Sequence, residues 1–460
     1  MAAGLAGAAA LAGPAAGAWS SAERVTPAGE SARFPSVAAN ARGDAVAAWT
    51  IRRNGRTVIQ AAIRRRGGAW ERPRTLTGAG RAALDPDAAI NDRGDLLVAF
   101  RRVVRTRTVQ TLRGPKRQAV YVVHARRRTV VGRGWGPVQR LSSGRQKSGA
   151  PEGALDAAGR AVVTWHWGTG TRPGDPGFVS QVQAATAGAR RRFGPPRRLS
   201  RRPGCPDAVG LPGLAVGVAG HAVIWWECRL GGRSVAVDYA LKAAGGTAFG
   251  SDRRLPGRGR VQPEPDGTVA RDGSVVLVLL RGAPNRRGAV LQYAARQGSR
   301  GALGPPRPLA GGARGVDLGV AGTAAGNALA AWIGPRGSGG RGPVQVAARG
   351  PGAPAFGPRE RVGPAGRTAD AEIAQNAAGA AAAVWLEGPE RGARLLAANR
   401  TDAARPWRAP AAVSASGALE RGNGGPALAI DGTGRALAYW ARASGGGSVI
   451  ERAEYRPDAT

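Results

Sequence analysis

A glycine recurs eight times along the 460-residue chain, at intervals of 51 to 65 residues. Six residues after each copy stands a large apolar side chain, and in six copies Asn, Asp or Thr stands three residues before it. A period of this length indicates one structural unit repeated eight times, numbered here as units 1 to 8 in chain order. The glycines are Gly43, Gly94, Gly159, Gly220, Gly273, Gly326, Gly379 and Gly434.

The spacing around each glycine is that of a tight hairpin turn. Asn or Asp at the start of a type I turn caps the turn with its side chain, and a glycine just past it adopts a positive φ. Short apolar runs flank the glycine, as in residues 36–39 and 45–49 of unit 1. We therefore predict that each glycine forms the corner, with a glycine bulge, between the first and second strands of its unit.

Two further strands follow in each unit. A run of alternating apolar residues, such as residues 289–296 in unit 5, predicts a third strand. A large apolar residue is then followed six positions later by Leu or Val, often with proline between, which is typical of an edge strand. These predicted fourth strands begin at Trp70, Trp135, Phe193, Phe249, Leu303, Phe356 and Trp407.

Four short strands in about 55 residues have the size of one propeller blade. Residues 19–460 therefore resemble a β-propeller, and we predict an all-β, eight-bladed propeller of four-stranded antiparallel blades in a single domain. Residues 19–25 carry an eighth fourth-strand signature, whereas the chain ends on a third-strand run at residues 448–456. We expect the N-terminal strand to join the last blade and close the ring. An open solenoid or two four-bladed rings are the alternatives.

The predicted architecture is similar to that of sialidase or Asp-box propellers and, loosely, of kelch-type propellers. An Asp box places an aromatic residue three positions after its glycine and a serine before it. Here the aromatic residue comes six positions after the glycine and the serine is missing. Neither the arginine triad nor the tyrosine nucleophile of sialidases can be placed on this chain, so the resemblance implies a fold and no catalytic residues.

Two other sequence features are explained by the repeat. The tripeptide Arg-Gly-Asp, known from cell adhesion, occurs at residues 42–44 and 93–95, but six equivalent corners keep only the glycine. We interpret both copies as turns. Of the twelve tryptophans, ten occupy repeat positions and are expected in the core, whereas Trp167 and Trp225 do not.

The formal charge of +37 favours an anionic partner such as an acidic glycan, a cell-wall polymer or an acidic protein. Only three of the 67 basic residues are lysines, and the chain is also rich in Ala, Gly and Pro, which is typical of a GC-rich genome. The arginines are spread over all units, which disfavours a nucleic-acid interface. No specific nucleic-acid partner is predicted, and we expect the protein to be a monomer.

The chain start and the cysteines indicate export. Residues 1–18 resemble a secretory signal peptide with an A-x-A cleavage pattern at residues 16–18, although a positive n-region is missing. No later apolar stretch reaches the length of a membrane span. Cys205 and Cys228 are the only cysteines, and in an exported chain they predict one disulfide rather than two free buried thiols. No metal site and no cofactor is expected.

Departures from the repeat mark the candidate binding site. The connection between the second and third strands is longest in units 2 and 3. In unit 4, Trp225 and Glu227 lie near the same connection and do not follow the repeat pattern. In a propeller these connections share one face. The candidate ligand-binding residues are Arg101, Arg105, Arg107, Arg113, Lys116, His166, Trp167, Asp175, Trp225 and Glu227.

No convergent catalytic set is visible, so the sequence favours a non-enzymatic binding or scaffold module, secreted or associated with the cell envelope. The alternative is a glycan-active hydrolase or lyase, with Glu227, Asp175 or Glu387 as candidate carboxylates. A pair of acids facing one pocket would favour the enzyme, whereas a flat arginine-rich face would favour the binding module.

Overall fold

A computed structural model describes most of the chain. The described residues are 17–27, 29–78, 82–130, 134–169, 178–202, 205, 208–230, 233–257, 260–261, 265–282, 289–335, 342–389, 391–415, 419–420, 424–445 and 447–457. They form β-strands, turns and bends, and no helix occurs among them. The all-β prediction is confirmed, and accordingly no membrane-spanning helix is found in this part of the chain.

Units 1 to 4 each contain the four predicted strands. Unit 1 has β2 (Ser31–Ala39), β3 (Ala45–Arg53), β4 (Arg56–Arg64) and β5 (Arg74–Thr75). Unit 2 has β6 (Ala83–Ile90), β7 (Leu96–Thr111), β8 (Gly114–Arg128) and β9 (Gln139–Arg140). Unit 3 has β10 (Lys147–Leu155), β11 (Ala161–Gly168), β12 (Ser180–Ala187) and β13 (Arg197–Arg198). Unit 4 has β14 (Ala208–Val209), β15 (Gly213–Val216), β16 (Ala222–Leu230), β17 (Arg233–Lys242) and β18 (Arg253–Arg254).

Units 5 to 8 repeat the pattern. Unit 5 has β19 (Asp266–Val269), β20 (Val275–Arg281), β21 (Ala289–Arg296) and β22 (Arg307–Pro308). Unit 6 has β23 (Arg314–Gly322), β24 (Ala328–Ile333), β25 (Val344–Arg349) and β26 (Glu360–Arg361). Unit 7 has β27 (Thr368–Gln375), β28 (Ala381–Glu387), β29 (Arg391–Arg400) and β30 (Ala411–Ala412). Unit 8 has β31 (Leu419–Glu420), β32 (Ala427–Ile430), β33 (Ala436–Ser444) and β34 (Gly447–Tyr455), and β1 (Glu23–Arg24) pairs with β34.

The eight repeat glycines form the predicted corners. All have a φ between 80° and 95°, where a side chain would be strained. Each glycine N–H donates to the carbonyl three residues earlier, as from Gly43 to Asn40 at 3.1 Å. In the two Arg-Gly-Asp copies the aspartates Asp44 and Asp95 are buried, and Asp44 Oδ1 accepts a hydrogen bond from the Arg66 N–H. A buried aspartate cannot be presented to a receptor, which supports the interpretation of both copies as turns.

The fourth strands are held by one repeated contact. The N–H of the Leu or Val that ends each signature donates to a carbonyl of the third strand, as from Leu76 to Ile59 at 2.8 Å. Val25 makes the same bond to Ile450, at the opposite end of the chain, also at 2.8 Å. The hydroxyl of Thr26 then accepts the Ile450 N–H at 3.0 Å, as Thr77 does from Ile59 in unit 1. The N-terminal segment therefore occupies the fourth-strand position of unit 8.

The hydrogen-bonding pattern differs from the prediction of separate four-stranded sheets. Strand β21 pairs with β23 of the next unit, and β29 pairs with both β30 and β31. As a result the units are joined into six sheets, two of which span more than one unit. The reason is local: the chain that enters the next unit runs beside the start of the preceding third strand and uses its open edge.

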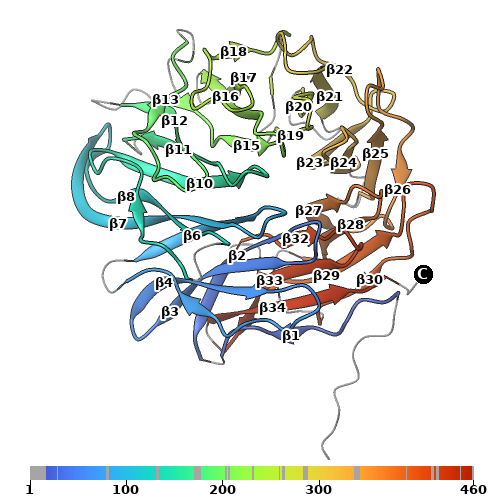
Figure 1. Ribbon diagram of the computed structural model, residues 1–460, viewed down its shortest axis with the longest axis horizontal. Helices are drawn as coiled ribbons and strands as arrows, with labels where there is room; N and C mark the ends of the chain where they lie inside the picture. Colours follow the sequence, from blue (N-terminus) through green and yellow to red (C-terminus); the bar gives the residue numbers. More distant parts are fainter. Residues whose placement is uncertain are drawn as a thin grey trace, which may run out of the picture.

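The core lies between units. Eight clusters of buried apolar side chains each combine residues of two neighbouring units. One of them joins Trp49 of unit 1 to Tyr439 and Ile450 of unit 8. The large residues six positions after the glycines are all buried, as predicted. Figure 1 shows the sheets following one another in chain order around the molecule, with β2 beside β32 and β33.

Candidate functional site

Three adjacent units carry charged or titratable residues at one position of the repeat, where unit 1 has the buried Thr50. Seven residues after the repeat glycine stand Arg101, His166 and Glu227 in units 2, 3 and 4. His166 and Glu227 lie near the ends of the second strands β11 and β16, whereas Arg101 lies within the long second strand β7. All three were predicted as ligand-binding residues. In units 5 to 8 the same position holds buried apolar side chains: Leu280, Ile333, Leu386 and Ala441.

Arg101 is fixed by two contacts. Its Nε forms an ion pair with Asp85 of β6, and its guanidinium lies 4.5 Å from the centroid of the Tyr121 ring. The Lys147 ammonium, from the first residue of β10, lies 5.7 Å from the same centroid. Tyr121 and Lys147 were not predicted, and together they connect unit 2 to unit 3.

His166 is held neutral at physiological pH. Its Nε2 lies 2.9 Å from the Ser180 hydroxyl. Burial, and then the positive charges of Lys147 and Arg229, lower the pKa of His166 to about 4. A neutral imidazole can accept a proton or a hydrogen bond, so His166 can act as a polar anchor or a weak base.

Glu227 is buried, with 3% of its surface exposed. It accepts hydrogen bonds from the Arg229 guanidinium at 3.2 Å and from the Ser234 hydroxyl. Trp225, two residues earlier, donates its indole N–H to the Pro265 carbonyl at 2.6 Å. Both predicted residues are therefore fixed in place by neighbours.

Glu227 and Trp225 line one cavity with three further carboxylates. The cavity has a volume of about 430 Å³, and Glu152, Asp266 and Glu372 also line it. Glu152 and Glu372 are solvent-exposed and belong to an adjoining cavity of about 730 Å³ as well, which Arg101 lines from unit 2. The predicted site residues of units 2 and 4 thus face one connected hollow.

The environment of two of these carboxylates, Asp266 and Glu152, favours their protonated forms. Burial raises the pKa of Asp266 to about 6. Loss of hydration among the surrounding protein atoms raises the pKa of Glu152 well above its usual range, and repulsion from Asp87 and Asp266 adds to this effect. A carboxylic acid that keeps its proton near neutral pH can serve as a general acid.

Carboxylates at a second position of the repeat also have a structural role. Seven residues before the repeat glycine stand Asp87, Glu152, Asp266 and Glu372. Asp87 accepts the Gly153 N–H of the next unit at 2.7 Å, and Asp266 accepts the Val320 N–H of its next unit at 2.6 Å. These carboxylates therefore link first strands of neighbouring units as well as lining the cavities.

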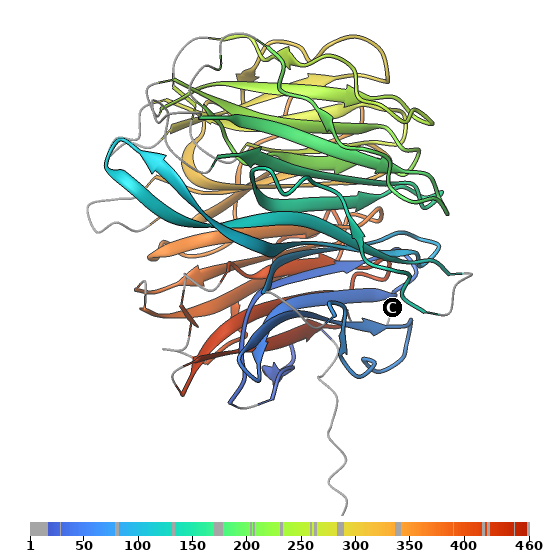
Figure 2. The ribbon, with the colours of Figure 1, turned by 90° about the vertical axis from the view of Figure 1, so that its left-hand side faces the viewer.

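The predicted basic loop of unit 2 is a pair of strands, which corrects the expectation of a loop. β7 and β8 continue past the body as one antiparallel ribbon that pairs as far as Thr111 and Gly114. Figure 2 shows this ribbon, in cyan, projecting from the molecule. These residues form strands because of their composition: in residues 102–111, β-branched Val and Thr side chains alternate with polar ones for most of the run, and such residues favour strands.

Four predicted residues lie on this ribbon. Arg105 donates to the Gly144 carbonyl at 3.0 Å, and Arg107 donates to the Arg145 carbonyl at 2.8 Å and to the Gln146 side chain at 2.5 Å. Arg113 and Lys116 are exposed near its tip. The ribbon is thus anchored at its base, and its distal cations are open to solvent.

The remaining predictions have separate outcomes. Cys205 and Cys228 form the predicted disulfide, and the Arg254 guanidinium lies 3.2 Å from both sulfur atoms. Trp167 is half-buried and packs against the core between units 2 and 3. Asp175 lies outside the described residues. Glu387 pairs with Arg394 in unit 7 and does not line the cavities described above.

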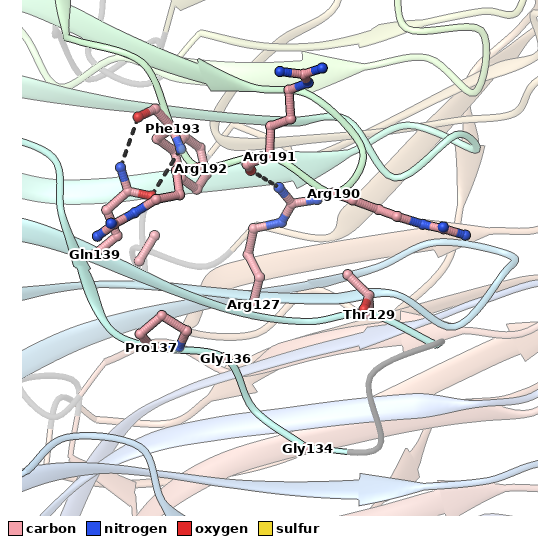
Figure 3. Close-up of a pocket in the computed structure, with 11 residues that line it drawn as sticks. Arg127, Thr129, Gly134, Gly136, Pro137, Gln139, Arg190, Arg191, Arg192 and Phe193 are labelled. Carbon is pink, nitrogen blue, oxygen red and sulfur yellow. Dashed lines mark hydrogen bonds between the residues drawn. The ribbon is translucent and has the colours of Figure 1, made fainter.

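A further pocket lies at the rim between units 2 and 3 (Figure 3). Its volume is about 240 Å³, and Arg127, Arg190 and Phe193 are among the residues that line it. The Arg127 guanidinium already donates to the carbonyls of residues 159, 188, 189 and 191. Because backbone carbonyls occupy this guanidinium, Arg127 itself is already engaged and is not offered to a ligand in this pocket.

Comparisons with known proteins give similarity in architecture alone. No family model matches the chain, and no curated protein sequence matches it. Among solved structures, the Hadza microbial sialidase Hz136 is 14% identical with a TM-score of 0.44, covering 86% of this chain and 73% of that one. The polysaccharide lyase Uly1 is 10% identical with a TM-score of 0.47, covering 78% and 87%. The α-L-arabinanase of Penicillium chrysogenum is 11% identical with a TM-score of 0.39, covering 72% and 98%.

Proposed function

We propose that the eight units form one closed, eight-bladed propeller over residues 19–460, exported after removal of residues 1–18. Three observations support the ring: the pairing of β1 with β34, the core that units 1 and 8 share, and a cavity of about 480 Å³ lined by turn residues of seven units. The disulfide supports an extracytoplasmic location.

We further propose that the protein is a glycan-cleaving enzyme whose site is the hollow that units 3, 4, 5 and 7 line with carboxylates and that Arg101 of unit 2 adjoins. The observation that carries this proposal is the set of four carboxylates, Glu152, Glu227, Asp266 and Glu372, on one cavity. Cleavage of a glycosidic bond by hydrolysis uses two carboxyl groups, one as acid and one as base or nucleophile. A hollow lined by several acids in different environments meets that requirement.

The environments suggest how the roles are divided. Asp266, with its pKa raised to about 6, and Glu152, with its pKa raised well above its usual range, are candidates for the acid that protonates the leaving oxygen. Glu227 receives its hydrogen bonds from Arg229 and Ser234, donors that suit an ionised carboxylate acting as base or nucleophile. Trp225 forms part of the wall and holds the strand end in position through Pro265.

A second candidate is the non-enzymatic binding module for an anionic glycan or protein. It is favoured by the structural contacts of Asp87 and Asp266 with neighbouring units, because a carboxylate that links strands need not react. It is also favoured by the exposed cations of the β7–β8 ribbon.

The test is a screen of the purified protein against neutral and acidic glycans, measuring reducing ends and the ultraviolet absorbance of unsaturated ends that elimination would create. We expect Glu227→Gln to lower the rate on a cleaved glycan by about a hundredfold or more. Glu387→Gln is the matched control, because it alters an arginine-paired carboxylate outside the hollow, and it should leave the rate unchanged. Binding of a glycan without release of any product would favour the second candidate instead.

A further inference from the structure

Two cations of the site share one aromatic ring, and a third lies close by. Arg101 and Lys147 lie 4.5 Å and 5.7 Å from the Tyr121 centroid. The arginine reaches it diagonally across the ribbon, because Arg101 pairs with Val123 while Tyr121 pairs with Val103. Lys116 lies nearer the tip of the ribbon, opposite Val109, and its charge also lowers the pKa of Lys147. In this cation cluster, Arg101 and Lys147 with Lys116 farther out, Arg101 lines the adjoining cavity.

The charges in this cluster are only partly compensated. Arg101 has Asp85 as its ion-pair partner. Among the described residues, no carboxylate forms an ion pair with Lys147 or Lys116. Burial, and then repulsion from Arg101 and Lys116, lowers the pKa of Lys147. Positive charges held together at the edge of a hollow repel one another, and an anion placed between them removes that repulsion.

The surroundings restrict the kind of anion. Asp85 and Glu372 line the cavity that Arg101 also lines, so carboxylates lie directly beside the cluster. A continuous polyanion such as a nucleic acid would place phosphates against these carboxylates. A glycan that carries anionic groups on some of its sugars can place one such group on the cations and its neutral parts over the acids.

We propose that Lys147 and Arg101, gathered around Tyr121, form a subsite for a sulfate or carboxylate group of an acidic glycan, with Lys116 farther out on the ribbon. The proposal rests on the proposed function insofar as the ligand is a glycan, and it adds the substrate class. The β7–β8 ribbon extends the same preference outward, because residues 102–117 contain six basic and no acidic residues. The ribbon therefore attracts acidic chains toward the subsite.

The experiment measures binding to the full-length protein. Its probes are dextran sulfate, polygalacturonate, neutral dextran and a single-stranded DNA of similar length. The variants are Lys147→Met, which keeps the side-chain length, and Lys147→Arg, which keeps the charge. Arg93→Gln is the control, because it removes one charge from an exposed turn at the other end of the second strand of unit 2. Folding of each variant is checked by its thermal unfolding midpoint.

We expect Lys147→Met to weaken binding of dextran sulfate or polygalacturonate by about tenfold or more, and the other two variants to stay within about twofold. The polymer that shows the larger loss identifies the group as sulfate or carboxylate. Equal binding by Lys147→Met and the unaltered protein would overturn the proposal. So would DNA binding that is as tight as that of the acidic glycans and equally dependent on Lys147.

Failure of this proposal is distinguishable from failure of the proposed function. Binding of an acidic glycan that depends on Lys147, with no cleavage of any glycan, supports the subsite and contradicts the enzyme. Cleavage of a glycan that depends on Glu227, with binding unaffected by Lys147→Met, supports the enzyme and contradicts the subsite.

Discussion

Units 2 to 4 and units 5 to 8 share one scaffold and differ at the same positions. Seven residues after the glycine, the first group has Arg101, His166 and Glu227, whereas the second group has Leu280, Ile333, Leu386 and Ala441. The apolar members are all buried in the cores between sheets. The scaffold therefore accepts an apolar residue at this position, and the three polar residues must be explained by another requirement.

The polar residues are retained together with their partners. Arg101 has Asp85, His166 has Ser180, and Glu227 has Arg229 and Ser234. Burial of a polar group costs free energy unless such partners are present. A scaffold that builds three partnered polar positions side by side, where four equivalents are apolar, has concentrated its chemistry in one sector.

The largest effect on stability is expected when a charged residue of the kind found in unit 2 replaces an apolar residue at the same position of units 5 to 8. Ile333→Arg places a charge at a fully buried position of unit 6 that is built for an apolar side chain. We expect unfolding free energy to fall by about 3–5 kcal/mol, or the variant to fail to fold. Urea denaturation measures the loss, and Ile333→Leu, expected to cost less than about 1.5 kcal/mol, is the control. A stable Ile333→Arg protein would show that the apolar group is not constrained as described.

The disulfide stabilises the polar sector. Cys205 and Cys228 are separated by 23 residues, and replacing both with alanine frees the segment that leads into unit 4. We expect a loss of about 3 kcal/mol in unfolding free energy. Comparison with the reduced, unaltered protein in the same denaturation experiment is the check, because both should lose the same amount.

Asp266 makes stability depend on pH in a definite direction. Its pKa is raised to about 6, so the folded protein holds a proton that the unfolded chain releases above its ordinary pKa. The contribution of Asp266 is therefore most favourable at low pH and is lost as the pH rises through about 6. Relative to Asp266→Asn, the unaltered protein should lose on the order of 1–2 kcal/mol between pH 4 and pH 7. If the difference in unfolding free energy between the two proteins stayed constant from pH 4 to pH 7, the raised pKa of Asp266 would be contradicted.

His166 should show the opposite dependence on pH. Its pKa is lowered to about 4, so the unfolded chain takes up a proton that the folded protein refuses. The stability that depends on neutral His166 is present above about pH 6.5 and is lost as the pH falls toward 4. At pH 7, His166→Leu should change unfolding free energy by less than about 1 kcal/mol, since the other units hold apolar residues there. A large loss at pH 7 would mean that the imidazole is a structural requirement.

The repeat allowed much of the fold to be predicted. Glycine at a positive φ and a short polar cap located all eight corners, and the fourth-strand signature identified the N-terminal partner of β34. The bridging pairs of β21 with β23 and of β29 with β31 were missed, because they depend on how chains run between units and not on a local pattern. The ribbon of unit 2 was taken for a loop although its Val and Thr content indicates strands.

The site was predicted in part. Arg101, His166 and Glu227 are predicted because they break the repeat pattern near the connections between second and third strands. Their shared position, seven residues after the repeat glycine, is a stronger signal. A second signal was missed: a carboxylate stands seven residues before the repeat glycine in four units, as Asp87, Glu152, Asp266 and Glu372. Tyr121 and Lys147 could not be found this way, because their proximity depends on the packing of β8 against β10 across two units.

The central claim is that the polar second-strand residues of units 2 to 4 contact the ligand, beside a hollow that Asp266 of unit 5 and Glu372 of unit 7 also line. Hydrogen–deuterium exchange with and without an acidic glycan tests it most directly, because it reports on every unit in one experiment. The account predicts added protection in β7, β8, β10, β11 and β16, and none in β24, β25, β28 and β29. Protection confined to units 6 and 7, or to the turns at the repeat glycines, would contradict it.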